Sequence, residues 1–402
     1  MSAGADRVRG SGGRGRRWLG LALVGLAVGL AALLGLGLSG GRGTRLAVRL
    51  GLRTPTPTSW PRARLASPEY GMQAFLWWHE DAARRDLQLI RDAGFGWVKQ
   101  NVGWRDVEGP AKGHFDWYQT DRIVGEAERL GLRVLLRLDR EPVWTVPPEG
   151  TFSDNGPPAD AQDFGDFCHA LATRYRGRVH AYQVWNEPNL AREWGGRTPD
   201  PAGYVALLRA CYIGIKSADP EALVISAGLA PTGNGPPDAL PDTDYLIGMY
   251  EAGAAPYFDL LGVHAPGFLY PPETPPEEVA AKHSGYDFFC FRHVERMREI
   301  MVRFGDADKQ VAVLEMGWTT DPKHPDYAWF AVTPEQQADY LVRAFRYAKE
   351  HWAPWIGPMF VISIADPRWT EDDEQYWWAI TEPGWPETRL RPAYLALRDM
   401  EK

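Results

Sequence analysis

The chain has 402 residues, of which 45% are hydrophobic and 24% are charged, so it can form one large globular domain or two ordinary ones. Its net charge of −8 is unevenly distributed, because residues 1–66 contain 11 Arg and a single acidic residue, Asp6. The remainder is therefore strongly acidic, which argues against nucleic acid as a partner.

The first segment of the chain is basic and is followed by a long apolar stretch. Residues 1–17 contain five Arg, and no charged residue occurs from Trp18 to Leu38. A helix of that length spans the roughly 30 Å core of a bilayer. The stretch is longer than the apolar part of a secretory signal and lacks a small-residue cleavage site. We therefore predict a cytoplasmic tail at 1–17 and a single-pass signal anchor at 18–39, with the body outside the cell membrane. A cleaved signal and a secreted body are the alternative.

Residues 40–68 are rich in Pro, Thr and Arg, which is typical of an extended linker. From residue 69 to residue 402, short apolar runs alternate with helical patterns. Strands are predicted at 70–75, 95–100, 133–138, 179–185, 222–227, 259–264, 311–315 and 356–363, and helices include 80–93 and 334–351. This alternation predicts an α/β fold, a (β/α)8 TIM barrel, over 69–402. An open doubly wound sheet is the alternative, but no Gly-rich phosphate-binding motif follows the first strand.

The three cysteines, Cys168, Cys211 and Cys290, form no CxxC pair. Cys168 and Cys211 fall in helical apolar patterns, so we interpret them as small buried hydrophobic residues. One disulfide is possible, and the sequence leaves its pairing open. A metal site built on these residues is not expected.

Polar residues stand at the ends of three predicted strands. The fourth strand ends in Asn186 and Glu187, the sixth in His264 and the seventh in Glu315. In a (β/α)8 barrel these ends meet at one mouth, and a carboxylate buried there is unfavourable unless something uses it. Retaining glycosidases need two carboxyl groups about 5–5.5 Å apart, whereas inverting enzymes need about 6.5–9.5 Å. We expect repulsion between the two carboxylates to separate their pKa values, so that one of them keeps its proton near neutral pH.

Two motifs carry a resemblance to a known group of enzymes. "WNEPN" at 185–189 and "LEMGW" at 314–318 resemble the signatures of clan A glycoside hydrolases, and residues 102–124 resemble the second-strand region of that clan. Family 39 is the nearest, followed by the cellulase-like family 5, and the resemblance extends from Tyr70 to the C-terminus. It implies that Glu187 is the general acid/base and Glu315 the nucleophile.

The same resemblance implies further roles at the site. Asn186 would hydrogen-bond the sugar 2-hydroxyl, and a hydrogen bond from His264 would keep Glu315 ionised and oriented. The clan usually places an Arg from an early strand near the nucleophile, and Arg137 is the candidate. The family often has an aromatic residue at the end of the eighth strand, whereas this sequence has Ser363 and Asp366 there, with Trp369 beyond.

Aromatic residues are abundant, with 18 Trp in the chain. Flat aromatic faces suit stacking against sugar rings. Two or three Trp of the predicted loops are therefore expected to bind substrate, the candidates being Trp104, Trp144, Trp318, Trp369, Trp377 and Trp378. No metal and no organic cofactor are expected. The expected partners are a carbohydrate substrate and, through 18–39, the membrane, and the oligomeric state stays open.

Together these features predict a retaining β-glycoside hydrolase that cleaves O-glycosidic bonds of an extracellular oligo- or polysaccharide by double displacement. Two alternatives stay open. One is a catalytically silent glycan-binding or envelope scaffold on the same fold, because fold alone does not determine function. The other is a transglycosylase that uses the same residues with a sugar acceptor in place of water. The sugar, the linkage and endo or exo action also stay open.

Overall fold

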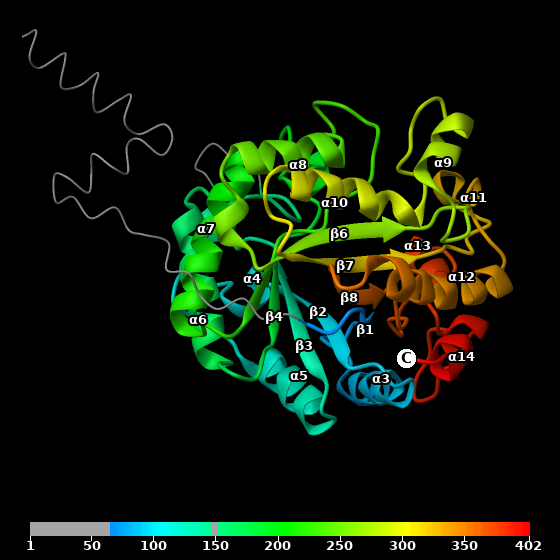
Figure 1. Cartoon of the computed structure of the whole chain (residues 1–402). Coiled ribbons are helices and arrows are strands. Elements are labelled where there is room, and N and C mark those ends of the chain that lie inside the picture. The colour runs from blue at the N-terminus through cyan, green and yellow to red at the C-terminus, as the bar shows by residue number, and fades with distance from the viewer. Residues whose placement is uncertain (1–64, 147–151) are drawn as a thin grey trace, which may run out of the picture. The chain divides into compact units, whose positions relative to one another are not determined.

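In the computed structural model, which describes residues 65–146 and 152–402, eight parallel strands form a closed barrel (Figure 1). The strands are β1 (Glu69–Gln73), β2 (Trp97–Gly103), β3 (Arg133–Asp139), β4 (Ala181–Val184), β5 (Leu223–Ile225), β6 (Leu260–Pro266), β7 (Gln310–Gly317) and β8 (Ile356–Val361). Each strand pairs with the next, and the barrel closes where β8 pairs with β1. The (β/α)8 prediction is therefore confirmed, with strand limits shifted by a few residues.

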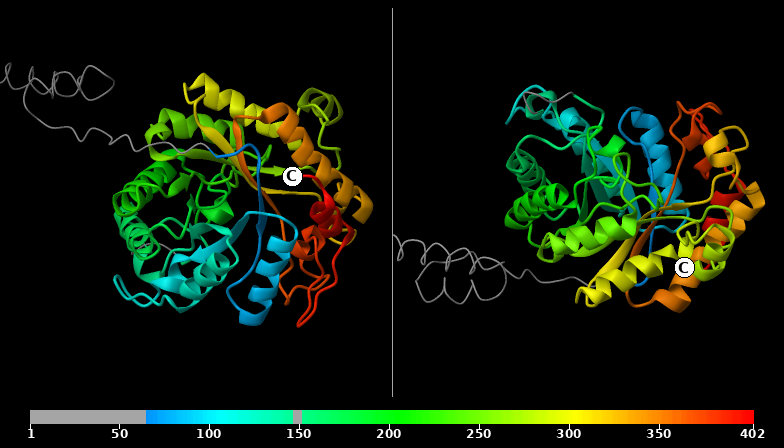
Figure 2. Two further views of the ribbon diagram at one scale, coloured as in Figure 1. Left: turned by 60° about the horizontal axis from the view of Figure 1, so that its bottom comes forward. Right: turned by 90° about the horizontal axis from the view of Figure 1, so that it is seen from above.

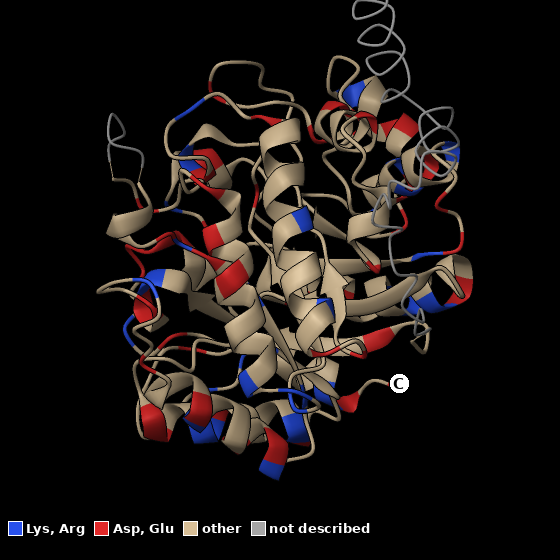
Figure 3. Cartoon of the chain, turned by 90° about the vertical axis from the view of Figure 1, so that its left-hand side faces the viewer, with Lys and Arg blue, Asp and Glu red and all other residues tan. Residues whose placement is uncertain are grey.

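Helices surround the barrel and connect successive strands (Figures 1 and 2). The longer ones are α3 (Glu80–Asp92), α5 (Tyr118–Arg129), α6 (Ala161–Arg174), α7 (Pro201–Ala218), α8 (Asp242–Glu251), α10 (Val294–Arg303), α12 (Pro334–Tyr347) and α14 (Pro392–Asp399). The shorter ones are α4 (Trp104–Val107), α9 (Pro276–Lys282), α11 (Pro325–Ala328) and α13 (Glu374–Trp378). The predicted start of α12 is confirmed, because the Thr333 side chain accepts a hydrogen bond from the Gln336 N–H in a capping box. Acidic and basic residues are interspersed along the helices on the side that Figure 3 shows.

The barrel interior changes from apolar to polar along the strands. At one end a cluster that includes Trp97, Leu135, Ala181 and Leu260 fills it. Because strand side chains alternate between the two faces, the residue two positions beyond each of these also faces inward. Those positions hold Lys99 after Trp97, Arg137 after Leu135 and Gln183 after Ala181. The polar layer lies towards the C-terminal ends of the strands, where the active sites of such barrels are found.

A disulfide joins the neighbouring helices α6 and α7. The helices approach closely because Gly165 and Gly214 have no side chains, and a Cβ at Gly214 would lie 2.3 Å from the Gly165 carbonyl oxygen. Cys168 and Cys211 form the disulfide, with a Cα–Cα distance of 5.3 Å, and Cys290 is free and buried. Both cysteines of the pair are buried, as we interpreted them, and the structure gives the pairing that the sequence left open. Both do lie on apolar helix faces, but the helical pattern could not show that the two faces meet.

Reduction of this disulfide should lower the free energy of unfolding by about 4 kcal/mol, because the bond joins residues 43 positions apart and restricts the unfolded chain. Urea unfolding of the full-length chain with and without a thiol reductant measures the effect. The Cys290→Ser variant should respond to the reductant like the wild type. A Cys168→Ser/Cys211→Ser variant as stable as the oxidised wild type would contradict the prediction.

No helix within residues 65–146 and 152–402 is long and apolar enough to cross a membrane. The predicted anchor at 18–39, the tail at 1–17 and nearly all of the predicted linker lie outside these described residues. Leu65, which was assigned to the linker, already contacts the barrel. Its N–H donates to Oε1 of Gln310 (2.9 Å), and Nε2 of Gln310 donates to its carbonyl oxygen (3.1 Å).

Candidate active site

The C-terminal ends of the strands surround a cleft of about 430 Å³ that contains both predicted carboxylates. Glu187 lies just beyond the end of β4, and Glu315 lies within β7. His264 of β6 is the register partner of Glu315. Asn186 and Arg137 also line the cleft. The topology therefore brings together five of the residues that the sequence predicted to form one site.

The backbone around Glu187 is fixed by several contacts. Trp185 has a φ of 71° and Glu187 a φ of 40°, values that are uncommon for residues with side chains and that cluster at functional sites. The Glu187 N–H donates to the Gly228 carbonyl (3.0 Å), and the buried Trp185 ring donates from Nε1 to the Glu193 carbonyl (2.9 Å). The side chain of Asn189 bonds both the N–H and the carbonyl of Ala230 (2.9 Å each). These contacts hold the Glu187 carboxylate at the cleft.

The two carboxylates lie close together. One oxygen of Glu187, one oxygen of Glu315 and one ring nitrogen of His264 all lie within 4.8 Å of one another. This spacing matches the short separation of about 5–5.5 Å in retaining glycosidases and falls below the roughly 6.5–9.5 Å of inverting enzymes. The separation of the pair is therefore that of retaining rather than inverting glycosidases.

His264 contacts the other carboxylate from the one that we expected. Its Nδ1 lies 2.9 Å from Oε1 of Glu187 and 3.8 Å from Oε2 of Glu315. The expected hydrogen bond to Glu315 is therefore replaced by one to Glu187. The register between β6 and β7 shifts at His264. The His264 ring also occupies space that is free because Gly228 has no side chain, since a Cβ at Gly228 would lie 2.1 Å from Cδ2 of His264. Neither feature is visible in the sequence.

Glu315 has a cationic partner that the sequence analysis missed. Lys99 of β2 is fully buried, and its Nζ donates to Oε1 of Glu315 (2.9 Å) and to the Leu314 carbonyl (3.0 Å). Arg137 was predicted to lie near the nucleophile, and its Nη1 is 3.5 Å from the same carboxylate oxygen. A lysine two positions beyond Trp97, on the same face of the strand, was the available signal.

These cations determine the charge of the carboxylates. Burial by itself raises the pKa of Glu315, but the charges of Lys99, His264 and Arg137 outweigh burial and lower that pKa to about 2. Burial also raises the pKa of Glu187, yet the hydrogen bond and charge of His264 hold it below its ordinary value. The expectation that one carboxyl group keeps its proton near neutral pH is therefore wrong, because the pKa values of Glu187 and Glu315 both lie below the ordinary value. Attraction to the cations exceeds the repulsion between the two carboxylates.

Replacement of Lys99 by Met should reduce kcat/KM by about 10²-fold at neutral pH, because a preorganised charge beside the reacting carboxylate is lost. The pKa of Glu315 should rise, since burial is then opposed by fewer cations. Glu315 must be ionised to attack, so the loss of activity on acidification should begin at a higher pH than in the wild type. The pH dependence of kcat/KM measures this shift.

Lys216 provides a matched control for the Lys99 variant. It is also a buried lysine, and its Nζ pairs with Asp259 (2.7 Å) outside the cleft. Lys216→Met should lower the free energy of unfolding. It should leave unchanged the pH at which kcat/KM falls on acidification, which is the acid limb of the pH profile. An acid limb that moves equally in both variants, or in neither, would contradict the role assigned to Lys99.

Glu187, His264 and Glu315 lie close enough together to be considered as metal ligands. Lys99 already donates to Oε1 of Glu315, and Arg137 lies near the same oxygen. Fixed positive charges at that oxygen disfavour a second cation. The absence of a metal requirement stays a prediction.

Of the predicted stacking residues, Trp369 and Trp378 line the cleft. Trp104 and Trp318 do not, and this corrects the prediction. Both rings are fully buried in the core, and their Nε1 atoms donate to Glu108 (2.6 Å) and to the Tyr270 carbonyl (2.9 Å). Loop position alone could not distinguish them from exposed rings.

The two remaining candidates also lie away from the cleft wall. Trp144 is half-buried against Trp104 and donates from Nε1 to the Glu108 carbonyl (2.9 Å). Trp377 lies beside Thr320, whose N–H donates to its carbonyl (3.1 Å). Neither ring lines the cleft that contains Glu187.

The cleft also contains buried polar atoms with no hydrogen-bond partner among the described residues. They are Oδ1 of Asn186, Oδ1 of Asn101, Oε1 of Gln73 and Nε2 of His264. Because buried polar groups are normally hydrogen-bonded, these atoms indicate a ligand rich in hydroxyl groups. Asn101 and Gln73 were missed by the sequence analysis, although each lies near the end of a predicted strand. Ser363, just beyond β8, lines the same cleft.

Several solved structures that are similar to this chain are glycoside hydrolases. A family 39 glycoside hydrolase from Bacteroides cellulosilyticus WH2 is similar to 83% of this chain with 21% identity and a TM-score of 0.62. The match spans 63% of that protein, so this chain covers less than two thirds of its length. A monomeric beta-xylosidase from Caulobacter crescentus CB15 has 18% identity and a TM-score of 0.56, with 83% of this chain and 69% of that chain covered.

A GH5_18 protein from Streptomyces cattleya, solved in complex with GlcNAc, has 16% identity and a TM-score of 0.59, with 83% of this chain and 80% of that chain covered. No family model and no curated protein matches the sequence. At these identities the likeness concerns the fold. The resemblance to clan A glycoside hydrolases is confirmed at that level.

Proposed function

We propose that this protein is a retaining β-glycoside hydrolase that cleaves O-glycosidic bonds of an oligo- or polysaccharide outside the cell. The observation that carries the proposal is the pair of carboxylates within 4.8 Å of each other at the mouth of the barrel. That separation suits attack on the sugar by one carboxylate directly. A glycan-binding scaffold would gain nothing from burying this pair together with Lys99, because buried charges are costly to desolvate.

The reaction proceeds in two displacements. In the first, Glu315 attacks the anomeric carbon while Glu187 gives its proton to the departing oxygen, which leaves a glycosyl ester on Glu315. In the second, Glu187 takes a proton from a water molecule that attacks the anomeric carbon, and Glu315 is released as a carboxylate. Asn186, with its unpaired Oδ1, is proposed to bind the sugar 2-hydroxyl.

Glu187 can change roles because the charge on Glu315 changes. Although the pKa of Glu187 lies below the ordinary value, the negative charge of Glu315 raises it, so protonated Glu187 is more populated before the ester forms than after. The ester on Glu315 has no such charge. The hydrogen bond from His264 then favours ionised Glu187, which is the form that acts as a base.

We further propose that residues 18–39 anchor the protein in the cell membrane and that the barrel lies outside. The Cys168–Cys211 bond supports this location, because disulfides persist in oxidising compartments and are rare in the cytosol. Full-length protein should stay with the membrane fraction after an alkaline wash. Release by the wash would favour a cleaved signal and a secreted protein.

Labelling with 2-deoxy-2-fluoro β-glycosides tests the proposed reaction. The full-length chain is incubated with dinitrophenyl derivatives of several sugars, and its peptides are analysed by mass spectrometry. An adduct on the peptide that contains Glu315 is expected, together with a burst of dinitrophenolate equal to the enzyme concentration. The Glu315→Gln variant should give neither signal. An adduct on another residue, or turnover of the natural glycoside without any adduct, would contradict the proposed nucleophile.

A further inference from the structure

A second pocket, of about 330 Å³, adjoins the cleft that contains Glu187 and Glu315. It lies over the ends of β1, β2, β3 and β8. Phe75, Asn101, Trp369 and Gln375 line both the pocket and the cleft. Because the two spaces share these walls, a ligand bound at the carboxylates can extend into the second pocket.

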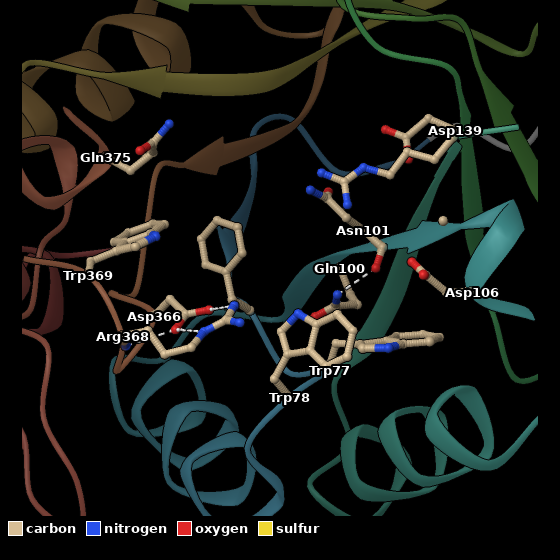
Figure 4. Close-up of a pocket in the computed structure, with 13 residues that line it drawn as sticks. Trp77, Trp78, Gln100, Asn101, Asp106, Asp139, Asp366, Arg368, Trp369 and Gln375 are labelled. Atoms are coloured by element: carbon tan, nitrogen blue, oxygen red, sulfur yellow. Dashed lines mark hydrogen bonds and ion pairs between the residues drawn. The ribbon is translucent and has the colours of Figure 1, made fainter. Parts of the chain in front are cut away.

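The walls of this second pocket combine aromatic rings with polar groups (Figure 4). Trp78 is 57% exposed, which is unusual for so large an apolar side chain, and the Arg368 guanidinium lies 5.7 Å from its ring centre. Trp369 packs edge to face on Phe75 at 4.7 Å where the pocket meets the cleft. Exposed aromatic faces beside hydrogen-bonding groups are suited to sugar rings, which have apolar faces and polar edges.

Two polar groups of the pocket are available to a ligand. Asn101 Oδ1 is buried and has no partner among the described residues. Asp139 is 1% exposed, and its carboxylate oxygens accept no hydrogen bond from the described residues, although Arg137 Nε forms an ion pair with one of them at 2.8 Å. A carboxylate oxygen only accepts hydrogen bonds, so the ligand must present donors such as hydroxyl groups.

The charges of the pocket favour a neutral sugar. Three carboxylates, those of Asp106, Asp139 and Asp366, face two guanidinium groups, those of Arg140 and Arg368. Arg368 is paired with Asp366 at 2.7 Å. Arg137 pairs with Asp139 at 2.8 Å, so three guanidinium groups balance the three carboxylates. The pocket therefore has no excess positive charge to attract the anionic group of a uronic acid or a sulfated sugar.

The position of Glu187 gives the direction of the chain. A general acid must stand beside the leaving oxygen, so the leaving group lies on the Glu187 side of the cleft. Arg192 and Tyr327 of the cleft belong to that side, since Arg192 Nη2 donates to Glu187 (3.3 Å) and neither residue lines the second pocket. The second pocket lies beyond Asn101 and Trp369, over strands that do not carry the acid/base. It therefore faces the part of the substrate that becomes attached to Glu315.

We infer that the second pocket binds a neutral sugar residue next to the one attacked by Glu315, so that the enzyme acts on chains with at least two sugars on that side of the scissile bond. This inference rests on the proposed function and adds its substrate class. It corresponds to release of disaccharides or longer fragments, in contrast to removal of single terminal sugars.

Paired chromogenic substrates test the inference on the full-length protein. The probes are 4-nitrophenyl β-glycosides of xylose, glucose, mannose and galactose and of the matching β-1,4-linked disaccharides. In at least one pair, kcat/KM for the disaccharide should exceed that for the monosaccharide by at least about tenfold, with the intact disaccharide as first product. Trp78→Ala should lower this ratio about tenfold. Trp385→Ala, which removes a ring that is 52% exposed and lines neither space, should keep the wild-type ratio.

Hydrolysis without a disaccharide preference in any pair, or a preference that Trp78→Ala leaves unchanged, would overturn the inference and leave the proposed function intact. Absence of hydrolysis in all pairs would instead count against the proposed function. In that case, calorimetric titration with the matching β-1,4-linked trisaccharides tests whether the second pocket binds sugar. Binding that is weakened in Trp78→Ala supports a sugar site, whereas absence of binding overturns it.

Discussion

Replacement of Glu315 by Ala should reduce hydrolysis of every glycoside substrate by about 10⁴- to 10⁶-fold, because the residue that forms the covalent intermediate is lost. The loss should be independent of the leaving group, since no better leaving group can replace a missing nucleophile. The fold should survive. Glu315 is partly exposed to the cleft, and its removal leaves Lys99 hydrogen-bonded to the Leu314 carbonyl.

Azide distinguishes a lost nucleophile from general damage to the site. In Glu315→Ala the anion can occupy the vacated space beside Lys99 and attack the sugar once, giving an α-glycosyl azide from a β-glycoside. Product configuration by NMR and kcat with and without azide are the measurements. Glu299→Ala on α10 is a control, because Glu299 is exposed and pairs with Arg296 away from the cleft. A variant that keeps more than about a tenth of wild-type turnover would rule out Glu315 as the nucleophile.

The fold and the placement of Glu187 and Glu315 in one cleft could be predicted because both depend on local sequence patterns. Apolar runs alternating with amphipathic helices give the strands, and parallel strands in a closed barrel bring their C-terminal ends to one mouth. The strand ends placed Glu187 and Glu315 at this mouth, and the resemblance to clan A glycoside hydrolases implied their roles. The start of α12 could be predicted for the same reason, because the capping box involves residues only three positions apart.

The contacts that tune the site could not be predicted because they join distant strands. Lys99 lies 216 positions from Glu315, and the bond depends on which strand faces are inward. His264 contacts Glu187 because of a register shift between β6 and β7 and an empty space at Gly228, and both are properties of the assembled barrel. The burial of Trp104 and Trp318 could not be predicted for a similar reason, because it depends on packing against parts of the chain that are distant in sequence.

The polar layer inside the barrel was accessible to sequence reasoning in principle. Lys99, Arg137 and Gln183 each stand two positions beyond an apolar inward-facing residue. Each of these polar residues follows an apolar inward-facing residue of its own strand, so together they mark where apolar side chains give way to polar ones along the strands. Comparison of the inward-facing positions of several strands, rather than of one strand at a time, would have placed Lys99 in the site.

Replacement of Glu187 by Ala should produce a loss that depends on the leaving group. For a natural sugar leaving group, which needs protonation, kcat/KM should fall by about 10²- to 10⁴-fold. For a dinitrophenyl glycoside, which departs without a proton, the first displacement should be nearly unaffected. The second step then limits turnover, because no base activates water. Azide should restore turnover by replacing water, and the product should be a β-glycosyl azide, opposite in configuration to that from Glu315→Ala.

The pH dependence provides an independent test of the same residue. Glu187 must be protonated for the first displacement, and its pKa lies below the ordinary value because of the hydrogen bond and charge of His264, despite burial. In the wild type, kcat/KM for a natural glycoside should therefore fall as pH rises, with the decline beginning on the acidic side of neutrality. In Glu187→Ala this basic limb should disappear. If Glu187→Ala retained this decline at high pH, or lost kcat/KM equally for natural and dinitrophenyl substrates, another group would have to protonate the leaving oxygen. Glu374 would then be the next residue to test, because it lines the same cleft and burial raises its pKa, a shift that favours a protonated acid at higher pH.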